Sequence, residues 1–289
     1  MSQRRGRETM SGEEVRDKSL FCCPVCGGPL LRAGRALRCA AGHSFDLAAQ
    51  GYVNLLPANK KHSAAPGDGK EMVAARRAFL EAGWYAPFSE ALCRIVPACL
   101  KDIKTPAVLD AGCGEGYYTG RLAKALRPGA RIAAFDISKE AVRLAAQRYR
   151  DVEFAVAGVF DIPAADGAMD CLVNIFAPMA QAEFLRVLRP GGFLLYAVPG
   201  PRHLFGLKSV LYEQPYENPV RQTEYPGFRF CRRVPVAGRI TLSGREEIRA
   251  LFAMTPYYWK TPRAGAEKLE QLDALQTEIE FDFLLYQKK

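Results

Sequence analysis

The period of the hydrophobic positions changes several times along the central part of the chain. Within 87–100, apolar residues recur every three or four positions, which predicts an amphipathic helix. Further on, short apolar runs typical of buried strands alternate with helical patterns. We expect strands over 107–112, 131–137, 152–158, 169–176 and 193–199, and helices over 118–126, 139–149 and 182–192. This alternation predicts an α/β fold with a parallel, doubly wound sheet.

The pattern is less regular after residue 200, but two further elements can be predicted. Ser243 and Glu246 have the spacing of a capping box, which predicts the start of a helix that reaches about Met254. Residues 278–286 alternate apolar and polar positions. They predict a two-faced strand, antiparallel to its neighbour and at or near the edge of the sheet.

The first 70 residues differ in composition from the rest of the chain. Residues 1–19 carry charges of both signs and almost no apolar side chains, so we expect a flexible tail. A compact Cys- and Gly-rich module follows over 20–56, then a linker over 57–70, and the remaining domain spans 71–289. A chain of 289 residues with 49% hydrophobic residues is long enough for this division.

Composition narrows the class of protein. The chain has 40 Lys and Arg residues against 31 Asp and Glu, and the net charge of +9 favours a polyanionic partner. Nine cysteines, an odd number, and the lack of a signal peptide argue against a secreted disulfide-rich protein. The chain has no run of about 18 apolar residues, so we expect no membrane span and a cytoplasmic location.

Four residues of the N-terminal module have the spacing of a metal site. Cys23 and Cys26 are separated by two residues, and Cys39 and His43 follow after a spacer long enough for a hairpin. Thiolate and imidazole ligands in two short pairs can surround one Zn²⁺ ion tetrahedrally. Because nothing in the pattern indicates an open coordination position, we predict a structural zinc site at these four residues.

A glycine-rich loop lies between a predicted strand and the helix that follows. It contains Asp110, Gly112, Gly114 and Gly116 in a D-x-G-x-G-x-G pattern, whose backbone can approach a ligand closely. Asp136 ends the next strand, where an acid accepts hydrogen bonds from ribose hydroxyls. NAD and S-adenosylmethionine both fit this arrangement. The loop lacks the G-x-G-x-x-G spacing of dinucleotide sites, and an acid ahead of it suits a cationic ligand, so S-adenosylmethionine is favoured.

The segments VLDAGCGEG (108–116) and LRPGGFLL (188–195), together with Asp136, resemble the class I S-adenosylmethionine-dependent methyltransferases. The resemblance implies a Rossmann-like sheet with the glycine loop and Asp136 at the cofactor. Many members of that class have an acid directly after the third strand, in contact with the adenine. This chain has no acid there, and Asp161 comes three residues later.

Further segments, taken in order, narrow the resemblance. They are FDLAAQGYVNLLP (45–57), PGD (66–68), EMVAARRAFLEAGWY (71–85), NIFAP (174–178), GPRHL (200–204) and MTPYYW (254–259). With the cysteine pairs and the glycine loop, this series resembles the bacterial 23S rRNA (guanine-N1)-methyltransferases over 20–289, with an N-terminal zinc-ribbon-like module. The resemblance implies methylation of N1 of one guanine in a 23S rRNA hairpin loop near the peptide exit tunnel, by a homodimer. One branch of the family contributes to tylosin-type macrolide resistance; NIFAP is similar to that branch and GPRHL to the other, so the target guanine stays open.

The resemblance also implies site residues. Beyond the four zinc ligands, it implies contacts to S-adenosylmethionine from Tyr85, Gly114, Glu115 and His203. The physical argument above adds Asp110, Gly112, Gly116 and Asp136. For His203, the alternative is an ordinary hydrogen-bonded histidine at the surface.

The chemistry then depends on placement, because the sulfonium of S-adenosylmethionine already activates the methyl group. Guanine N1 carries a proton, which must be accepted or whose loss must be stabilised at O6. Asn174, after the fourth strand, could hydrogen-bond the base, and Phe176 could stack on it. The alternative for both is packing at the end of a strand, and the sequence identifies no general base.

Contacts to RNA phosphates would come from basic residues. The candidates are Lys60, Lys61, Arg76, Arg77, Arg221, Arg229, Arg232, Arg233 and Arg239. A solvated basic face is the alternative. Two other functions compete with an RNA methyltransferase: a methyltransferase for a small molecule with a zinc appendage, and a zinc-ribbon RNA-binding protein without catalytic activity.

Overall fold

The computed structural model describes residues 18–60, 67–220 and 224–289. The predicted tail, 1–19, lies outside these ranges apart from its last two residues, and the predicted linker, 57–70, is described in part. Among the described residues, no helix is both long enough and apolar enough to span a membrane.

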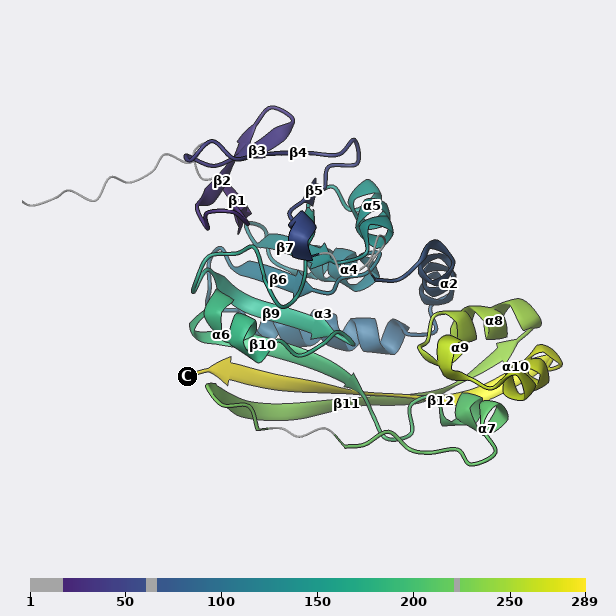
Figure 1. The fold of residues 1–289 in the computed structure, drawn as a ribbon. Coiled ribbons are helices and arrows are strands. Elements are labelled where there is room, and N and C mark those ends of the chain that lie inside the picture. Colours follow the sequence, from purple (N-terminus) through teal and green to yellow (C-terminus); the bar gives the residue numbers. More distant parts are fainter. Residues whose placement is uncertain (1–17, 61–66, 221–223) are drawn as a thin grey trace, which may run out of the picture.

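Eight strands form one large sheet in the order β11-β12-β10-β9-β6-β7-β8-β5 (Figure 1). Their bounds are β5 Val53–Asn54, β6 Ala107–Ala111, β7 Arg131–Asp136, β8 Glu153–Val156, β9 Met169–Ile175, β10 Leu188–Pro199, β11 Phe228–Ser243 and β12 Ala274–Lys288. The strands from β5 to β10 pair in parallel, whereas β12 runs antiparallel to β10 and β11. The predicted parallel, doubly wound α/β sheet is therefore confirmed.

Helices cover both faces of this sheet. Their bounds are α2 Lys70–Glu81, α3 Ala86–Cys99, α4 Tyr117–Ala125, α5 Lys139–Arg148, α6 Gln181–Val187, α7 Phe205–Leu211, α8 Arg245–Ala253, α9 Tyr257–Lys260 and α10 Arg263–Glu270, after a short 3₁₀ helix, η1 Ala58–Lys60. Because side chains alternate along a strand, Val108 faces a core formed with α3, α4 and α5. Leu109 faces a second core, formed with α6 and the N-terminal module.

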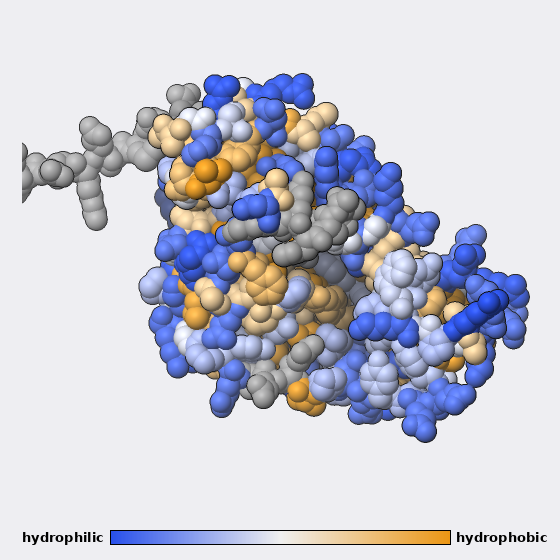
Figure 2. Space-filling model, in the orientation of Figure 1, coloured by the Kyte–Doolittle hydropathy of each residue, from blue (hydrophilic) through white to orange (hydrophobic). Residues whose placement is uncertain are grey.

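The C-terminal helices gather at one end of the sheet. In Figure 1, α7, α8, α9 and α10 lie together at this end, and α8 packs against α2. Figure 2 shows that the surface is hollowed between these helices and the rest of the molecule, and that apolar residues gather near the middle of the same face.

The N-terminal module is a four-stranded antiparallel sheet that is hydrogen-bonded to the large one. Its strands are β1 Lys18–Cys22, β2 Pro29–Ala33, β3 Ala36–Arg38 and β4 Ser44–Asp46. The Glu153 carboxylate on β8 accepts hydrogen bonds from the Ser19 hydroxyl (2.7 Å) and the Leu20 amide (2.9 Å). The Cys22 amide donates to the Pro163 carbonyl (2.7 Å). After β4, the chain enters β5, which pairs with β8. The end of this module is therefore a strand of the large sheet.

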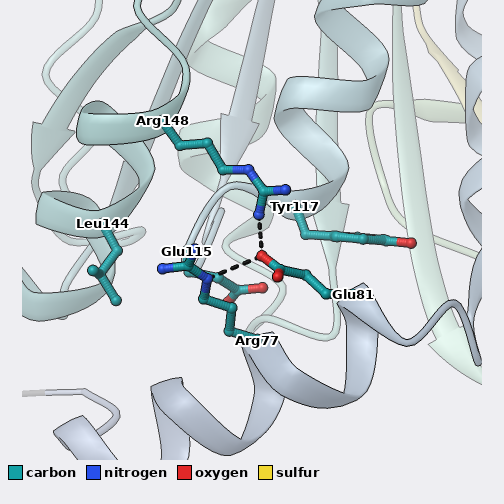
Figure 3. A pocket seen from close by; sticks show the side chains of 6 residues that line it. All are labelled: Arg77, Glu81, Glu115, Tyr117, Leu144 and Arg148. Atoms are coloured by element: carbon teal, nitrogen blue, oxygen red, sulfur yellow. Dashed lines mark hydrogen bonds and ion pairs between the residues drawn. The ribbon is translucent and has the colours of Figure 1, made fainter.

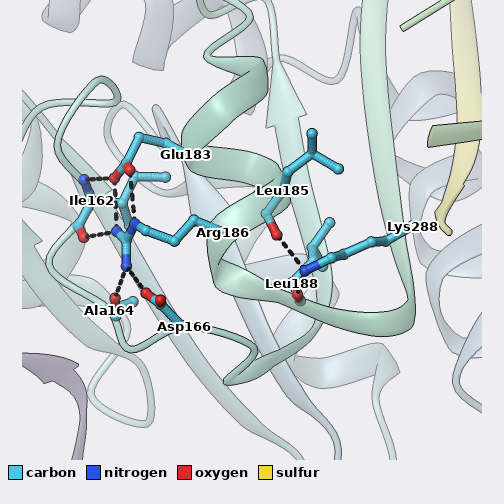
Figure 4. Close-up of polar contacts among 8 residues, drawn as sticks. All are labelled: Ile162, Ala164, Asp166, Glu183, Leu185, Arg186, Leu188 and Lys288. Atoms are coloured by element: carbon cyan, nitrogen blue, oxygen red, sulfur yellow. Dashed lines mark hydrogen bonds and ion pairs between the residues drawn. The ribbon is translucent and has the colours of Figure 1, made fainter. Parts of the chain in front are cut away.

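The prediction of a helix over 182–192 is wrong in its second half. Helix α6 ends at Val187, and β10 begins at Leu188. Pro190 cannot donate to a helix and disfavours helical backbone in the residue before it. Lys288, at the end of β12, donates through Nζ to the carbonyls of Leu185 (2.6 Å) and Leu188 (2.7 Å), as Figure 4 shows. Carbonyls left free where the helix ends are thus satisfied from another strand.

The predicted capping box is also wrong. Ser243 is the last residue of β11, where it pairs with Ala274, and its side chain does not cap α8. The helix starts after Gly244, which has a φ of 136°. Glu247, not Glu246, accepts the hydrogen bond from the Ser243 amide (3.0 Å). Pairing in the sheet therefore outweighs the local capping signal.

Strand β11 is the main element that the sequence analysis did not predict. The predicted strand 278–286 lies within β12, one strand from the edge, because β11 pairs with its outer side. Most side chains of β11 between Arg229 and Arg239 are exposed or half-buried. Their polar character hides the alternation that normally indicates a strand.

Candidate functional site

The structure brings the four predicted metal ligands together. Cys23 and Cys26 follow β1, whereas Cys39 and His43 lie between β3 and β4, and their ligand atoms are all within 4.8 Å of one another. The Sγ atoms of Cys26 and Cys39 are 3.7 Å apart. The Nδ1 atom of His43 lies 3.5 Å from Cys23 Sγ and 3.3 Å from Cys39 Sγ. Two thiolates bound tetrahedrally to one zinc ion at about 2.3 Å are about 3.8 Å apart, so the donor set fits zinc in both chemistry and size.

The glycine loop turns sharply between β6 and α4. The amides of Gly112 (2.9 Å) and Cys113 (3.0 Å) both donate to the Phe135 carbonyl on the neighbouring strand. Gly112 has a φ of 87°, and a Cβ on it would lie 2.6 Å from the Cβ of Ala177. Gly116 is also left-handed, with a φ of 80°, and begins α4. Only glycine fits at position 112, so the loop backbone packs directly against the loop after β9.

Three carboxyl groups surround this loop. The buried Asp110 accepts a hydrogen bond from the Thr119 hydroxyl (2.5 Å) on Oδ2 and has no partner on Oδ1 among the described residues. Asp136 accepts hydrogen bonds from the amides of Gly114 (2.9 Å) and Ser138 (2.8 Å). Burial raises the pKa of Asp110 to about 7 and also raises the pKa values of Glu115 and Asp136. A cationic ligand would stabilise the ionised forms of all three.

Tyr85 and His203 meet beside this loop, although 118 residues separate them in the sequence. The Glu280 amide donates to Nδ1 of His203 (3.2 Å), so the imidazole proton sits on Nε2 and is donated to the Tyr85 hydroxyl oxygen (3.3 Å). His203 is only 8% exposed, so it is not the surface histidine of the alternative reading. Burial, and after it the nearby charge of Lys208, lowers the pKa of His203 to about 3. The imidazole is therefore neutral, and its unprotonated nitrogen, Nδ1, already accepts the hydrogen bond from the Glu280 amide.

Lys208 is a site-supporting residue that the sequence analysis missed. Its side chain is fully buried, and Nζ donates to the Tyr216 carbonyl (3.0 Å) and to Oδ1 of Asn218 (2.8 Å). Asn218 in turn donates to the Gly200 carbonyl (2.8 Å), at the start of the GPRHL segment. Lys208 thus helps to hold the segment that carries His203. A single lysine in a helical stretch gives no signal of such a role in the sequence.

Asn174 and Phe176 lie where β9 ends, next to the glycine loop. The Asn174 side chain is fully buried, and Nδ2 donates to the carbonyls of Ala111 (3.4 Å) and Pro178 (3.3 Å). Because both neighbours are acceptors, the amide orientation is determined, and Oδ1 has no partner among the described residues. Phe176 is 45% exposed and has a left-handed φ of 55°, a conformation that is uncommon for a bulky residue. Its ring is nearly parallel to that of His203, with centroids 6.4 Å apart.

The basic candidates do not form one free surface. Lys61 and Arg221 lie outside the described residues. Arg76 and Arg77 are paired with Asp68 (2.6 Å) and Glu81 (2.9 Å), and Arg76 lies at the glycine loop. Along β11, Arg229 bonds Gln287, Arg233 and Arg239 lie near acids of β12, and Arg232 is exposed.

Comparison with known proteins adds independent information. The family model described as RlmA, N-terminal, matches residues 21–64, and a methyltransferase domain model matches residues 108–192. A relative from Micromonospora griseorubida, named putative 23S rRNA (guanine-N(1)-)-methyltransferase, is 40% identical over 84% of this chain and 88% of its own. The 23S rRNA (guanine(748)-N(1))-methyltransferase of Streptomyces fradiae is 41% identical over 65% of this chain and 66% of its own. A Bacillus subtilis relative with the same name as the first is 29% identical over 94% of this chain and 98% of its own.

Removal of one zinc ligand tests the metal centre. We expect Cys39→Ser to reduce bound zinc from about one ion per chain to nearly none, because three ligands hold the metal much more weakly. The N-terminal module should then lose protection from proteolysis while the large sheet stays folded. Metal content by mass spectrometry and limited proteolysis check this. Cys231→Ser, at an exposed position of β11, is the control and should keep the zinc; a metal-free but protease-resistant module would contradict the prediction.

The buried His203 predicts a pH dependence of stability. The unfolded chain protonates this histidine near pH 6.5, whereas the folded protein resists protonation down to about pH 3. The free energy of unfolding should therefore fall as the pH is lowered through this window, by at most about 1.4 kcal/mol per pH unit from this residue. In urea denaturation, we expect the free energy of unfolding of His203→Gln to fall less steeply than that of the wild type between about pH 6 and pH 4.

The comparison of wild type and variant isolates this effect. Asp110, whose raised pKa makes the folded state hold a proton, contributes with the opposite sign, but it is present in both proteins. Zinc release at low pH is also common to both. Equal slopes for wild type and His203→Gln would show that His203 is not held neutral by the fold.

Proposed function

Because this chain belongs to the family of 23S rRNA (guanine-N1)-methyltransferases, we propose that it methylates N1 of one guanine in a 23S rRNA hairpin loop near the peptide exit tunnel. The enzyme depends on S-adenosylmethionine and carries a structural zinc. The 41% identity to the S. fradiae relative, which is named for guanine 748, supports that guanine as the target. The resemblance of NIFAP to one branch of the family supports a link to tylosin-type macrolide resistance. The family resemblance of the sequence further supports a homodimer, and a ribosomal RNA substrate agrees with a cytoplasmic location.

One observation carries the proposal: at the end of β9, beside the glycine loop, an exposed aromatic ring is available for a base to stack on, and a buried amide holds the loop that carries it. Asn174 Oδ1 is a buried acceptor with no partner among the described residues. The exposed, left-handed Phe176 offers an aromatic face beside it. Bases in RNA loops are bound in this way, by stacking on aromatic side chains.

Some residues of the site would bind the cofactor, and others would position the groups that contact it. S-adenosylmethionine, when bound, supplies an activated methyl group. Asp136, at the end of β7, would accept hydrogen bonds from ribose hydroxyls, and the glycines of the 112–116 loop would let the ligand approach closely. Tyr85 keeps a free hydroxyl proton to donate, because its oxygen accepts the hydrogen bond from His203. His203 is accordingly a positioning residue for Tyr85 and not the acceptor of the N1 proton.

Placement therefore accounts for most of the proposed catalysis. Holding N1 and the methyl carbon in line removes the entropic cost of bringing the two together. Asn174 contributes by tying the glycine loop, through Ala111, to the loop after β9, through Pro178. Because the Asn174 side chain is fully buried, it would act on the guanine indirectly, by holding the loop that carries Phe176 against the glycine loop.

The substrate tests the proposed function directly. We expect the purified protein with S-adenosylmethionine to methylate a 23S rRNA hairpin transcript that contains guanine 748. Primer extension should stop one nucleotide before the modified base, because a methyl group on N1 blocks Watson–Crick pairing. A transcript with that guanine changed to adenine is the control. Methyl transfer to small molecules but not to RNA would favour the small-molecule alternative, and S-adenosylmethionine binding without any transfer would indicate a non-catalytic RNA-binding protein.

Asn174→Ala tests the role of the buried amide. We expect kcat for RNA methylation to fall by about 10- to 100-fold, because the loop after β9 and the glycine loop lose their common anchor. Cys171→Ala, another buried position on β9, is the control for packing and should retain most of the turnover. Normal turnover in Asn174→Ala would exclude this residue from positioning the guanine.

A further inference from the structure

Arg76 of α2 lies against the glycine loop, far from the position expected of a phosphate-binding surface residue. Its Nη1 atom is 3.6 Å from the point that a Cβ on Gly114 would occupy. Nη1 also forms an ion pair with Asp68 (2.6 Å), and the Arg76 side chain is 25% exposed. A guanidinium held in this way is directed at the loop and away from bulk solvent.

The segment that carries Asp68 is itself fixed to the cofactor side of the sheet. The Ser138 hydroxyl donates to the Asp68 carbonyl (2.8 Å), and Ser138 also donates its amide to Asp136. Gly67 packs so closely on this turn that a Cβ would lie 2.9 Å from Ile137. The start of α2 and the end of β7 therefore form one wall beside Asp136.

Arg76 is the cation that acts on the acidic groups around the glycine loop. Its charge acts on Asp68, Glu115 and Asp136, and it lowers the pKa of Glu115 and Asp136 against the effect of burial. It also acts on Tyr118, at the start of α4. Arg76 therefore lies close enough to the expected ribose contact, Asp136, and to the start of α4 for its charge to act on both.

S-adenosylmethionine has one anionic group, the carboxylate of its methionine part. Next to Glu115 and Asp136 that carboxylate would be repelled unless a cation faced it. A guanidinium can bind a carboxylate through two parallel N–H groups, and the ion pair of Arg76 with Asp68 is made through Nη1.

We propose that the Arg76 guanidinium binds the carboxylate of the methionine part of S-adenosylmethionine, with Asp68 as the residue that orients it. The inference rests on the cofactor site of the proposed function but not on the identity of the RNA. It assigns different roles to two consecutive arginines. Arg77, on the next position of α2, pairs with Glu81, which also contacts Arg148, and these side chains converge on one another (Figure 3).

Two ligands that differ in the aminocarboxylate group distinguish this role from general support of the fold. S-adenosylhomocysteine contains the group, whereas 5′-methylthioadenosine keeps the nucleoside and the sulfur but lacks it. We expect Arg76→Met to weaken S-adenosylhomocysteine binding by about 10- to 100-fold in calorimetry, and 5′-methylthioadenosine binding by less than about threefold. Arg76→Lys keeps the charge but not the pair of parallel N–H groups. Its affinity for S-adenosylhomocysteine should lie between those of the wild type and Arg76→Met.

Arg77→Met is the matched control and should bind both ligands as wild type does. Thermal unfolding of each variant shows whether the fold is retained. Equal losses for both ligands in Arg76→Met, or no loss for either, would overturn the proposal. Failure of the wild-type protein to bind S-adenosylhomocysteine would instead argue against the cofactor site, and normal binding without RNA methylation would argue against the proposed substrate.

Discussion

The close approach of the Gly112 backbone to Ala177 is the constraint on which the rest of the site depends. No side chain fits between the loop after β6 and the loop after β9, so these two loops are in direct contact. The Phe135 carbonyl and the Asn174 amide fix them from either side. The glycine loop after one strand and the Asn174–Phe176 segment after another are thereby held at the carboxyl edge of a parallel sheet, where ligands bind in this class of fold.

The features that the sequence predicted well are those whose residues are close together in the chain. The zinc ligands form two short pairs, and the glycine loop with Asp136 spans one strand-loop-helix-strand unit, so their spacing alone determines their geometry. Tyr85 and His203 were assigned to the cofactor site only from family resemblance, and their contact with each other was not predicted, because the two are distant in sequence. The roles of Lys208 and Asp68 could not be predicted, since each depends on a contact that the fold creates.

Errors in the secondary structure have the same origin. The end of helix α6 depends partly on Pro190, a local signal, and partly on Lys288, about 100 residues later, whose contacts with the carbonyls there the sequence does not show. Arg186 similarly ties the 162–166 loop to α6 through Glu183 and the Ile162 and Ala164 carbonyls (Figure 4). Local propensity is a weak prior, and tertiary contacts of this kind override it.

The two edges of the large sheet are protected in different ways. On one side, β5 is only two residues long and the N-terminal module continues from it, so little unpaired backbone is left there. On the other side, β11 presents the outer edge of a 16-residue strand. Long, regular edges invite edge-to-edge pairing with other chains, and charged residues and proline discourage it. Arg232, Arg233 and Pro235 lie on this strand, so part of the basic surplus of the chain would keep the protein from aggregating, whatever it contributes to RNA binding.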